Sequence, residues 1–144
     1  MATLHFSHIA ISCTDPLAVE RFYTKHFGFW RARVVPVNGD QVVFIRREDI
    51  YLEIFHALSD TPLPAPGSGA EHPGWRHLAF QVDNVDAKLA EMGTDARITR
   101  GPMNFDNIIP GWRSVWVADP AGNIVEISQG YVDQENPPPL EIHP

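Results

Sequence analysis

The chain has 144 residues, 44% of them apolar, which is enough for one compact domain with its own core. No run reaches the roughly 18 apolar residues of a membrane span, and the first five residues lack the basic-then-apolar pattern of a secretory signal. A net charge of −7 and arginines scattered among apolar residues argue against nucleic-acid binding.

Cys13 is the only cysteine, so an internal disulfide and a structural zinc site made of thiolates are excluded. A cytoplasmic location fits this composition. We therefore expect a small-molecule partner, and neither a nucleic acid nor a membrane.

The first half of the chain predicts the element order β-α-β-β-β. A strand begins at His8, and Asp15-Pro16 opens a helix that ends near His26 and is stopped by Gly28. Three strands follow over 30–37, 41–46 and 51–57, the first two joined by a hairpin turn at Asn38-Gly39-Asp40.

The second half repeats this order. His77-Leu78-Ala79-Phe80 matches His8-Ile9-Ala10-Ile11, and a helix with Asp83 as its expected cap runs to a left-handed stop at Gly93. Strands are predicted over 96–103, 112–118 and 124–130, and the last carries Val125-Glu126-Ile127 where the first half carries Leu52-Glu53-Ile54.

These repeats divide the chain into a first βαβββ module over 1–57 and a second over 74–130, within one domain overall. The segment 58–73 is rich in Pro, Gly and Ala and is the expected linker. The last segment, 131–144, contains three consecutive prolines and is the expected extended tail.

Strand alternation puts a His or Glu on the non-aliphatic face of four strands. A carboxylate in an apolar strand needs a partner or a metal, and imidazole with carboxylate suits nickel, cobalt, zinc, iron or manganese. A hydrogen-bonded core histidine or a solvated glutamate is the alternative for each residue alone. The candidate ligands are His8, Glu53, His77 and Glu126.

The sequence resembles the vicinal oxygen chelate superfamily, which includes glyoxalases, bleomycin resistance proteins and extradiol dioxygenases. Besides the two His-containing strands, the resemblance rests on 21–23, 27–29 and the segment Asp119-Pro120-Ala121-Gly122-Asn123. It implies an α+β fold in which two βαβββ modules form a half-open mixed β-barrel around a metal site. It also implies a homodimer, with modules paired within one chain or across a domain-swapped dimer.

The resemblance implies that the four candidate ligands match the glyoxalase I set and hold one divalent ion per site. It further implies a metal-dependent lyase or isomerase that chelates vicinal oxygens of a small molecule and stabilises an enediolate-like intermediate. Glu126 first and Glu53 second are the expected proton shuttles. Ser12 and Ala57 replace two residues that contact glutathione in bacterial glyoxalase I, which argues for a different substrate.

An extradiol-type dioxygenase is one alternative, although such a site needs only three protein ligands. An enzyme that modifies an antibiotic, or a drug-binding resistance protein of the same fold, is another. Face parity and bulk then nominate five residues that line the substrate pocket: Tyr51, Phe55, Trp75, Phe44 and Trp116. Arg46 is added to this pocket for its charge and, with Arg33 and Arg113, is a candidate to bind an anionic substrate group.

Overall fold

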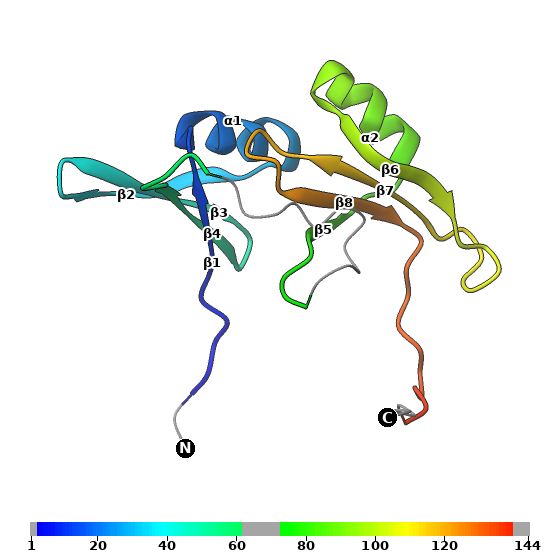
Figure 1. Ribbon diagram of the computed structural model, residues 1–144. Helices are drawn as coiled ribbons and strands as arrows, with labels where there is room; N and C mark the ends of the chain where they lie inside the picture. Colours follow the sequence, from blue (N-terminus) through cyan, green and yellow to red (C-terminus); the bar gives the residue numbers. More distant parts are fainter. Residues whose placement is uncertain (1–2, 62–72, 140–144) are drawn as a thin grey trace.

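The structure of the chain is a computed structural model that describes residues 3–61 and 73–139. Two four-stranded mixed sheets lie next to each other, each with one α-helix against it (Figure 1). The first sheet has the strand order β1-β4-β3-β2 and the second has the order β5-β8-β7-β6. This is the predicted α+β fold with two βαβββ modules.

The first module follows the predicted order closely. Its elements are β1 (Ile9–Cys13), α1 (Pro16–Phe27), β2 (Trp30–Val37), β3 (Asp40–Arg47) and β4 (Ile50–His56). The Asp15 side chain caps α1 by accepting from the Ala18 N–H at 3.0 Å, and Gly28 ends the helix in the left-handed conformation. Both predicted caps of this helix are therefore confirmed.

The second module contains β5 (Leu78–Gln81), α2 (Val85–Met92), the 3-10 turn η1 (Gly93–Asp95), β6 (Arg97–Asn104), β7 (Arg113–Ala118) and β8 (Ile124–Gln129). Two details of the prediction are wrong. The cap of α2 is Asn84 rather than Asp83, because the Asn84 side chain accepts from the Ala87 N–H at 2.8 Å. Gly93 has a positive φ of 59° but a ψ of −129°, so it starts η1 instead of adopting a left-handed helical stop.

Both helices lie on the same side of the sheet layer (Figure 1). The aliphatic face of each sheet packs under them, with Ile45, Leu52 and Ile127 fully buried. The opposite faces are open, and the N-terminal and C-terminal segments leave the sheets on that side (Figure 1). The alternation of side chains along each strand produces these two faces, because one is aliphatic and the other is not.

The two modules are joined by contacts on the helix side. Tyr23 of α1 donates a hydrogen bond of 2.8 Å to Asp119, and both residues are fully buried. Burial and the Asp119 carboxylate hold the pKa of Tyr23 far above its ordinary value, so its hydroxyl remains a donor. Phe27 stacks on Phe80 of β5 with 4.3 Å between ring centroids.

Of the expected linker over 58–73, only 58–61 and 73 fall within the described residues. The described part of the expected tail, 131–139, contains no helix or strand. No helix in the described ranges is long and apolar enough to cross a membrane.

Candidate functional site

Each module presents one His–Glu pair on its open sheet face. His8 Nε2 lies 2.9 Å from a Glu53 carboxylate oxygen, and His77 Nε2 lies 2.7 Å from a Glu126 oxygen. The two glutamates lie in β4 and β8, and the two histidines directly precede β1 and β5. Because β1 and β4 pair in the same register as β5 and β8, the repeat places both pairs at equivalent positions.

The structure does not bring the two pairs together. Among the described residues, no group of three or more His, Cys, Asp or Glu side chains could hold one metal ion. The four predicted ligands thus form two separate His–Glu pairs in a single chain, one on each sheet.

The second ring nitrogens of the two histidines differ. His8 Nδ1 lies 2.8 Å from the Ser7 hydroxyl. His77 Nδ1 is buried and has no hydrogen-bond partner in the described part of the chain. A metal-bound histidine usually has such a partner, so the first module presents the more complete arrangement.

The donor set suits a divalent ion. In both pairs the carboxylate contacts Nε2, and a cation placed between imidazole and carboxylate would satisfy both groups. The glutamate side chains are about 15% exposed, which makes an unpartnered charge there costly. Cys13 is not a further ligand candidate, since burial, followed by the Asp119 charge, raises the pKa of its thiol to about 11.

The predicted pocket residues of the first module lie on the same sheet face as its His–Glu pair. Phe44 pairs in register with Glu53 and meets His8 edge-on, with 5.9 Å between ring centroids. The Arg46 guanidinium lies 5.1 Å from the centroid of the Tyr51 ring. Tyr51 and Phe55 share the face of Glu53 because they lie two residues from it in β4.

In the second module, Trp116 pairs in register with Glu126 and lies edge-on to His77, with 6.5 Å between ring centroids. It is 8% exposed, so most of its ring is covered within the single chain, and its place in a pocket wall stays a prediction. Trp75 precedes β5 and is 98% exposed, so the single chain does not place it against either pair.

Sequence reasoning missed several polar residues on this second face. Arg100 of β6 pairs in register with Trp116, and its guanidinium lies 5.2 Å from the centroid of the Trp116 ring. Ser114 and Ser128 are buried and hydrogen-bonded at 3.0 Å, and the Trp112 indole donates to Ser128 at 3.1 Å. The alternation that puts Glu126 on this face also puts Ser128 there, although Ser128 was not predicted as a site residue, and the same alternation would have found Ser114. Counting alternate residues along β6 does not give the face of Arg100, because the strand register is irregular between Ile98 and Arg100.

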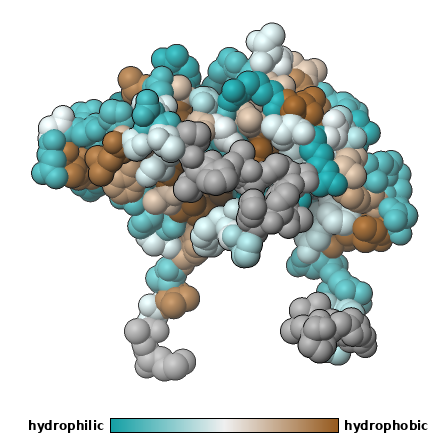
Figure 2. All heavy atoms as spheres, viewed as in Figure 1, coloured by the Kyte–Doolittle hydropathy of each residue, from teal (hydrophilic) through white to brown (hydrophobic). Residues whose placement is uncertain are grey.

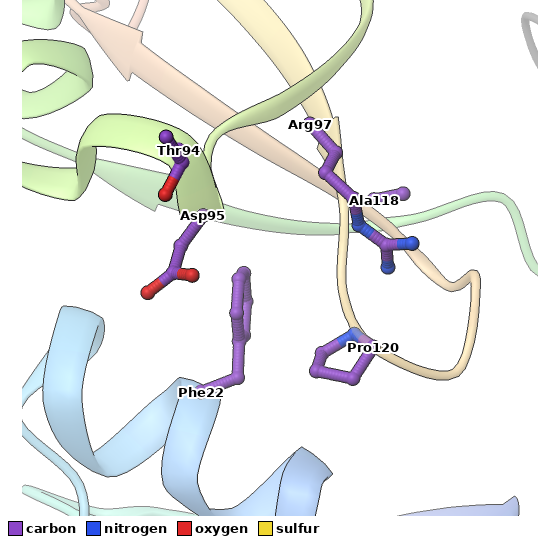
Figure 3. Close-up of a pocket in the computed structure, with 6 residues that line it drawn as sticks. All are labelled: Phe22, Thr94, Asp95, Arg97, Ala118 and Pro120. Atoms are coloured by element: carbon purple, nitrogen blue, oxygen red, sulfur yellow. The ribbon is translucent and has the colours of Figure 1, made fainter.

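A separate hollow of about 240 Å³ lies between the modules on the helix side. Figure 3 shows Phe22 pointing from α1 into this hollow, with Asp95 and Arg97 on either side of it. Thr94, Ala118 and Pro120 complete its lining. It contains none of the His–Glu residues, so it is distinct from the candidate site.

Comparison with known proteins identifies the family to which this fold belongs. The model of the Glyoxalase/Bleomycin resistance protein/Dioxygenase superfamily matches residues 5–127. No curated protein matches the chain.

Several solved structures share the fold. A glyoxalase family protein from Enterococcus faecalis is 30% identical, with a TM-score of 0.63 and coverage of 86% of this chain and 96% of the other. A lactoylglutathione lyase from Agrobacterium tumefaciens is 24% identical, with a TM-score of 0.58 and coverage of 90% and 96%. TnmS3, an antibiotic binding protein from Streptomyces, is 24% identical, with a TM-score of 0.64 and coverage of 91% and 99%. The chain therefore belongs to the Glyoxalase/Bleomycin resistance protein/Dioxygenase superfamily.

Proposed function

We propose that this protein is a metal-dependent lyase or isomerase of the glyoxalase type that acts on a small molecule with two neighbouring oxygens. Its site combines the His8–Glu53 pair of one copy with the His77–Glu126 pair of a second copy. One divalent ion, of nickel, cobalt, zinc, iron or manganese, is held by each complete set of four ligands.

The observation that carries the proposal is the equivalence of the two pairs. Each has an imidazole Nε2 within 2.9 Å of a carboxylate oxygen, at the same register position of its sheet. A merely structural hydrogen bond is free to diverge between the two modules, as the residues around the pairs have done. Two halves of one metal site would require both pairs to be kept.

A second copy is invoked because one chain leaves the two pairs apart and leaves apolar side chains uncovered. Leu4 and Phe6 are 91% and 66% exposed, and Val132 is 63% exposed. Figure 2 shows the described parts of the N-terminal and C-terminal segments standing clear of the body. Apolar segments that extend from the same side as the open faces favour a partner that covers both.

Within such a site, the glutamates have a second role. A bound divalent ion supplies Lewis acidity to the chelated substrate oxygens. The Glu126 carboxylate takes a proton from the substrate carbon next to them and returns it to the neighbouring carbon, and Glu53 is the second candidate for this step. Phe44 and Trp116 flank the pairs and exclude water from the reacting atoms.

Two residues argue against lactoylglutathione as the substrate. Ser12 and Ala57 stand where bacterial glyoxalase I carries glutathione contacts, and neither can supply the charge or amide found there. A dioxygenase reaction is less favoured, because the fourth protein ligand would occupy a coordination position that a two-histidine, one-carboxylate iron site leaves open.

Metal content and assembly state test the proposal together. We expect purified protein to be a dimer with about one divalent ion per chain, measured by light scattering and elemental analysis. Glu53→Gln and His77→Ala should each abolish stoichiometric metal binding. His56→Ala is the matched control, because His56 also pairs with a carboxylate, Asp40, at 2.8 Å but lies on the other face of β4.

Metal binding by both ligand variants at the parental level would overturn the proposed site. Loss of metal from His56→Ala alone would place the ion at the His56–Asp40 pair instead. A metal-loaded monomer would overturn the shared site.

A further inference from the structure

The repeat extends beyond the His–Glu pairs into a row across each sheet. In the first module the register aligns Ala10, Glu53, Phe44 and Arg33 on neighbouring strands. In the second it aligns Ala79, Glu126, Trp116 and Arg100. Directly paired residues share a face, so each row carries a glutamate, an aromatic ring and an arginine on the open face.

The second row contains a buried polar group that has no hydrogen-bond partner in the described part of the chain. Trp116 is more than nine-tenths buried, and its Nε1 has no hydrogen-bond acceptor in the described ranges. A buried indole N–H left in this state costs about 1–3 kcal/mol. The aromatic residue of the first row, Phe44, has no such donor.

Arg100 supplies a positive charge next to that donor. Its guanidinium lies 5.2 Å from the centroid of the Trp116 ring, and no carboxylate partner for it occurs among the described residues. By contrast, Arg31 and Arg113 pair with Glu20 and Asp86 at 2.8 and 2.7 Å. In a chain with an excess of acidic residues, an arginine on the open face without an acidic partner is available to an anionic ligand.

We propose that Trp116 and Arg100 form a carboxylate-binding wall, and that the substrate of the proposed metal site is a small planar organic acid. The inference rests on the proposed function for the location of the chelating oxygens. Arg100 donates to the carboxylate, whose oxygen also accepts from Trp116 Nε1–H. The backbones of Glu126 and Arg100 are two strand spacings, about 10 Å, apart. The substrate carboxylate bound by Arg100 therefore lies close to the substrate oxygens that chelate the metal.

Simple probes test the wall without catalysis. Titration calorimetry with benzoate, benzamide and phenylphosphonate should be done on metal-free and zinc-loaded protein. The carboxylate of benzoate can itself coordinate zinc, so its binding to the metal-free protein reports on the wall, and the zinc-loaded form adds the contribution of the metal. We expect benzoate to bind the metal-free form at least about tenfold more tightly than benzamide, its neutral analogue.

Variants then locate the effect. Arg100→Gln should remove the preference for benzoate, whereas Arg21→Gln, which removes the same charge from the exposed side of α1, should preserve it. Arg33→Gln should weaken benzoate binding less than Arg100→Gln. Trp116→Phe, which gives the second row the ring type of the first, should weaken it by about threefold.

Equal affinity for benzoate and benzamide, or an unchanged preference in Arg100→Gln, would overturn the inference. Tighter binding of phenylphosphonate than of benzoate would overturn the assignment to a carboxylate. A weaker dimer with unchanged benzoate affinity in Trp116→Phe would mean that the second copy covers the indole. Failure of the parent protein to bind metal would overturn the proposed function. A parent protein that binds metal but does not prefer benzoate to benzamide would overturn this inference alone.

Discussion

The two modules share a plan but differ in the chemistry of their open faces. In the first, Val42 and Phe55 lie at one end of this face, two positions from Phe44 and Glu53, and both are apolar, whereas Arg46 and Tyr51 lie at the other end. The end of the first wall at Val42 is thus apolar and aromatic.

In the second module the corresponding residues are Ser114 and Ser128, which are hydrogen-bonded to each other, and the ring next to them is Trp116, whose Nε1–H has no acceptor among the described residues. The repeat therefore preserved the ligand positions while the surrounding walls diverged. A site made of one wall of each kind can hold a planar apolar body on one side and a polar group on the other.

The largest effect is expected when the histidine of one pair is removed in one chain and the histidine of the other pair is removed in another chain. His8→Ala and His77→Ala chains should each lose more than about 100-fold in metal affinity, since even outer-shell changes cost about 10- to 100-fold. Mixing the two chains after unfolding and refolding should restore one complete site per mixed dimer, measured as bound metal.

Restoration on mixing would show that each site takes one pair from each copy. The matched mixture is His8→Ala with Glu53→Gln, which damages the same half-site in both chains and should bind no metal. Equal metal content in the two mixtures would contradict the shared site.

The β3–β4 and β7–β8 turns differ as strongly as the walls. Asp119 is fully buried and accepts from Tyr23 and from the backbone N–H groups of Ala121 and Asn123. Asp119→Ala should lower the free energy of unfolding by about 3 kcal/mol, because several buried donors lose their acceptor. Urea unfolding measures this. Asp49→Ala, in the exposed turn of the first module, should change it by less than about 0.5 kcal/mol.

A smaller effect is expected from the polar wall itself. Ser128→Ala removes the acceptor of the Trp112 indole and the partner of Ser114, so unfolding should become easier by about 1–2 kcal/mol. Ser12→Ala, on the exposed face of β1, is the control and should stay within about 0.5 kcal/mol. Equal effects of the two changes in urea unfolding would mean that the serine network does not stabilise the second wall.

The smallest effect concerns the exposed charges between the modules. Hydrogen bonds from Lys25 and then His26 hold the pKa of Asp95 below its ordinary value of 3.8. Because the pKa of Asp95 is lower in the folded than in the unfolded protein, its carboxylate stabilises the fold at any pH above the unfolded-state pKa. This stabilisation is lost as the pH falls through the folded-state pKa. Asp95→Asn should therefore be slightly less stable than the parent near about pH 6, with the difference vanishing near about pH 2. A difference that grows in acid would contradict this sign.

The sequence alone determined the element order, the faces and the likeness of the two halves. Periodicity and turn residues were sufficient because Asp15-Pro16, Gly28 and Asn38-Gly39 act locally, and the structure confirms each of them. The cap of α2 was missed by one residue, since Asp83 and Asn84 are both good caps and only the backbone path selects between them. Parity likewise identified the His–Glu residues, because alternation along a strand depends on nothing beyond the strand.

Only the tertiary structure decided which of these residues meet. It pairs His8 with Glu53 and His77 with Glu126, and it leaves the two pairs on separate sheets. It also placed Arg100 over Trp116, which an irregular strand register concealed from any counting along the sequence. Distances between strands depend on pairing and on how the sheets pack, and a linear pattern carries neither.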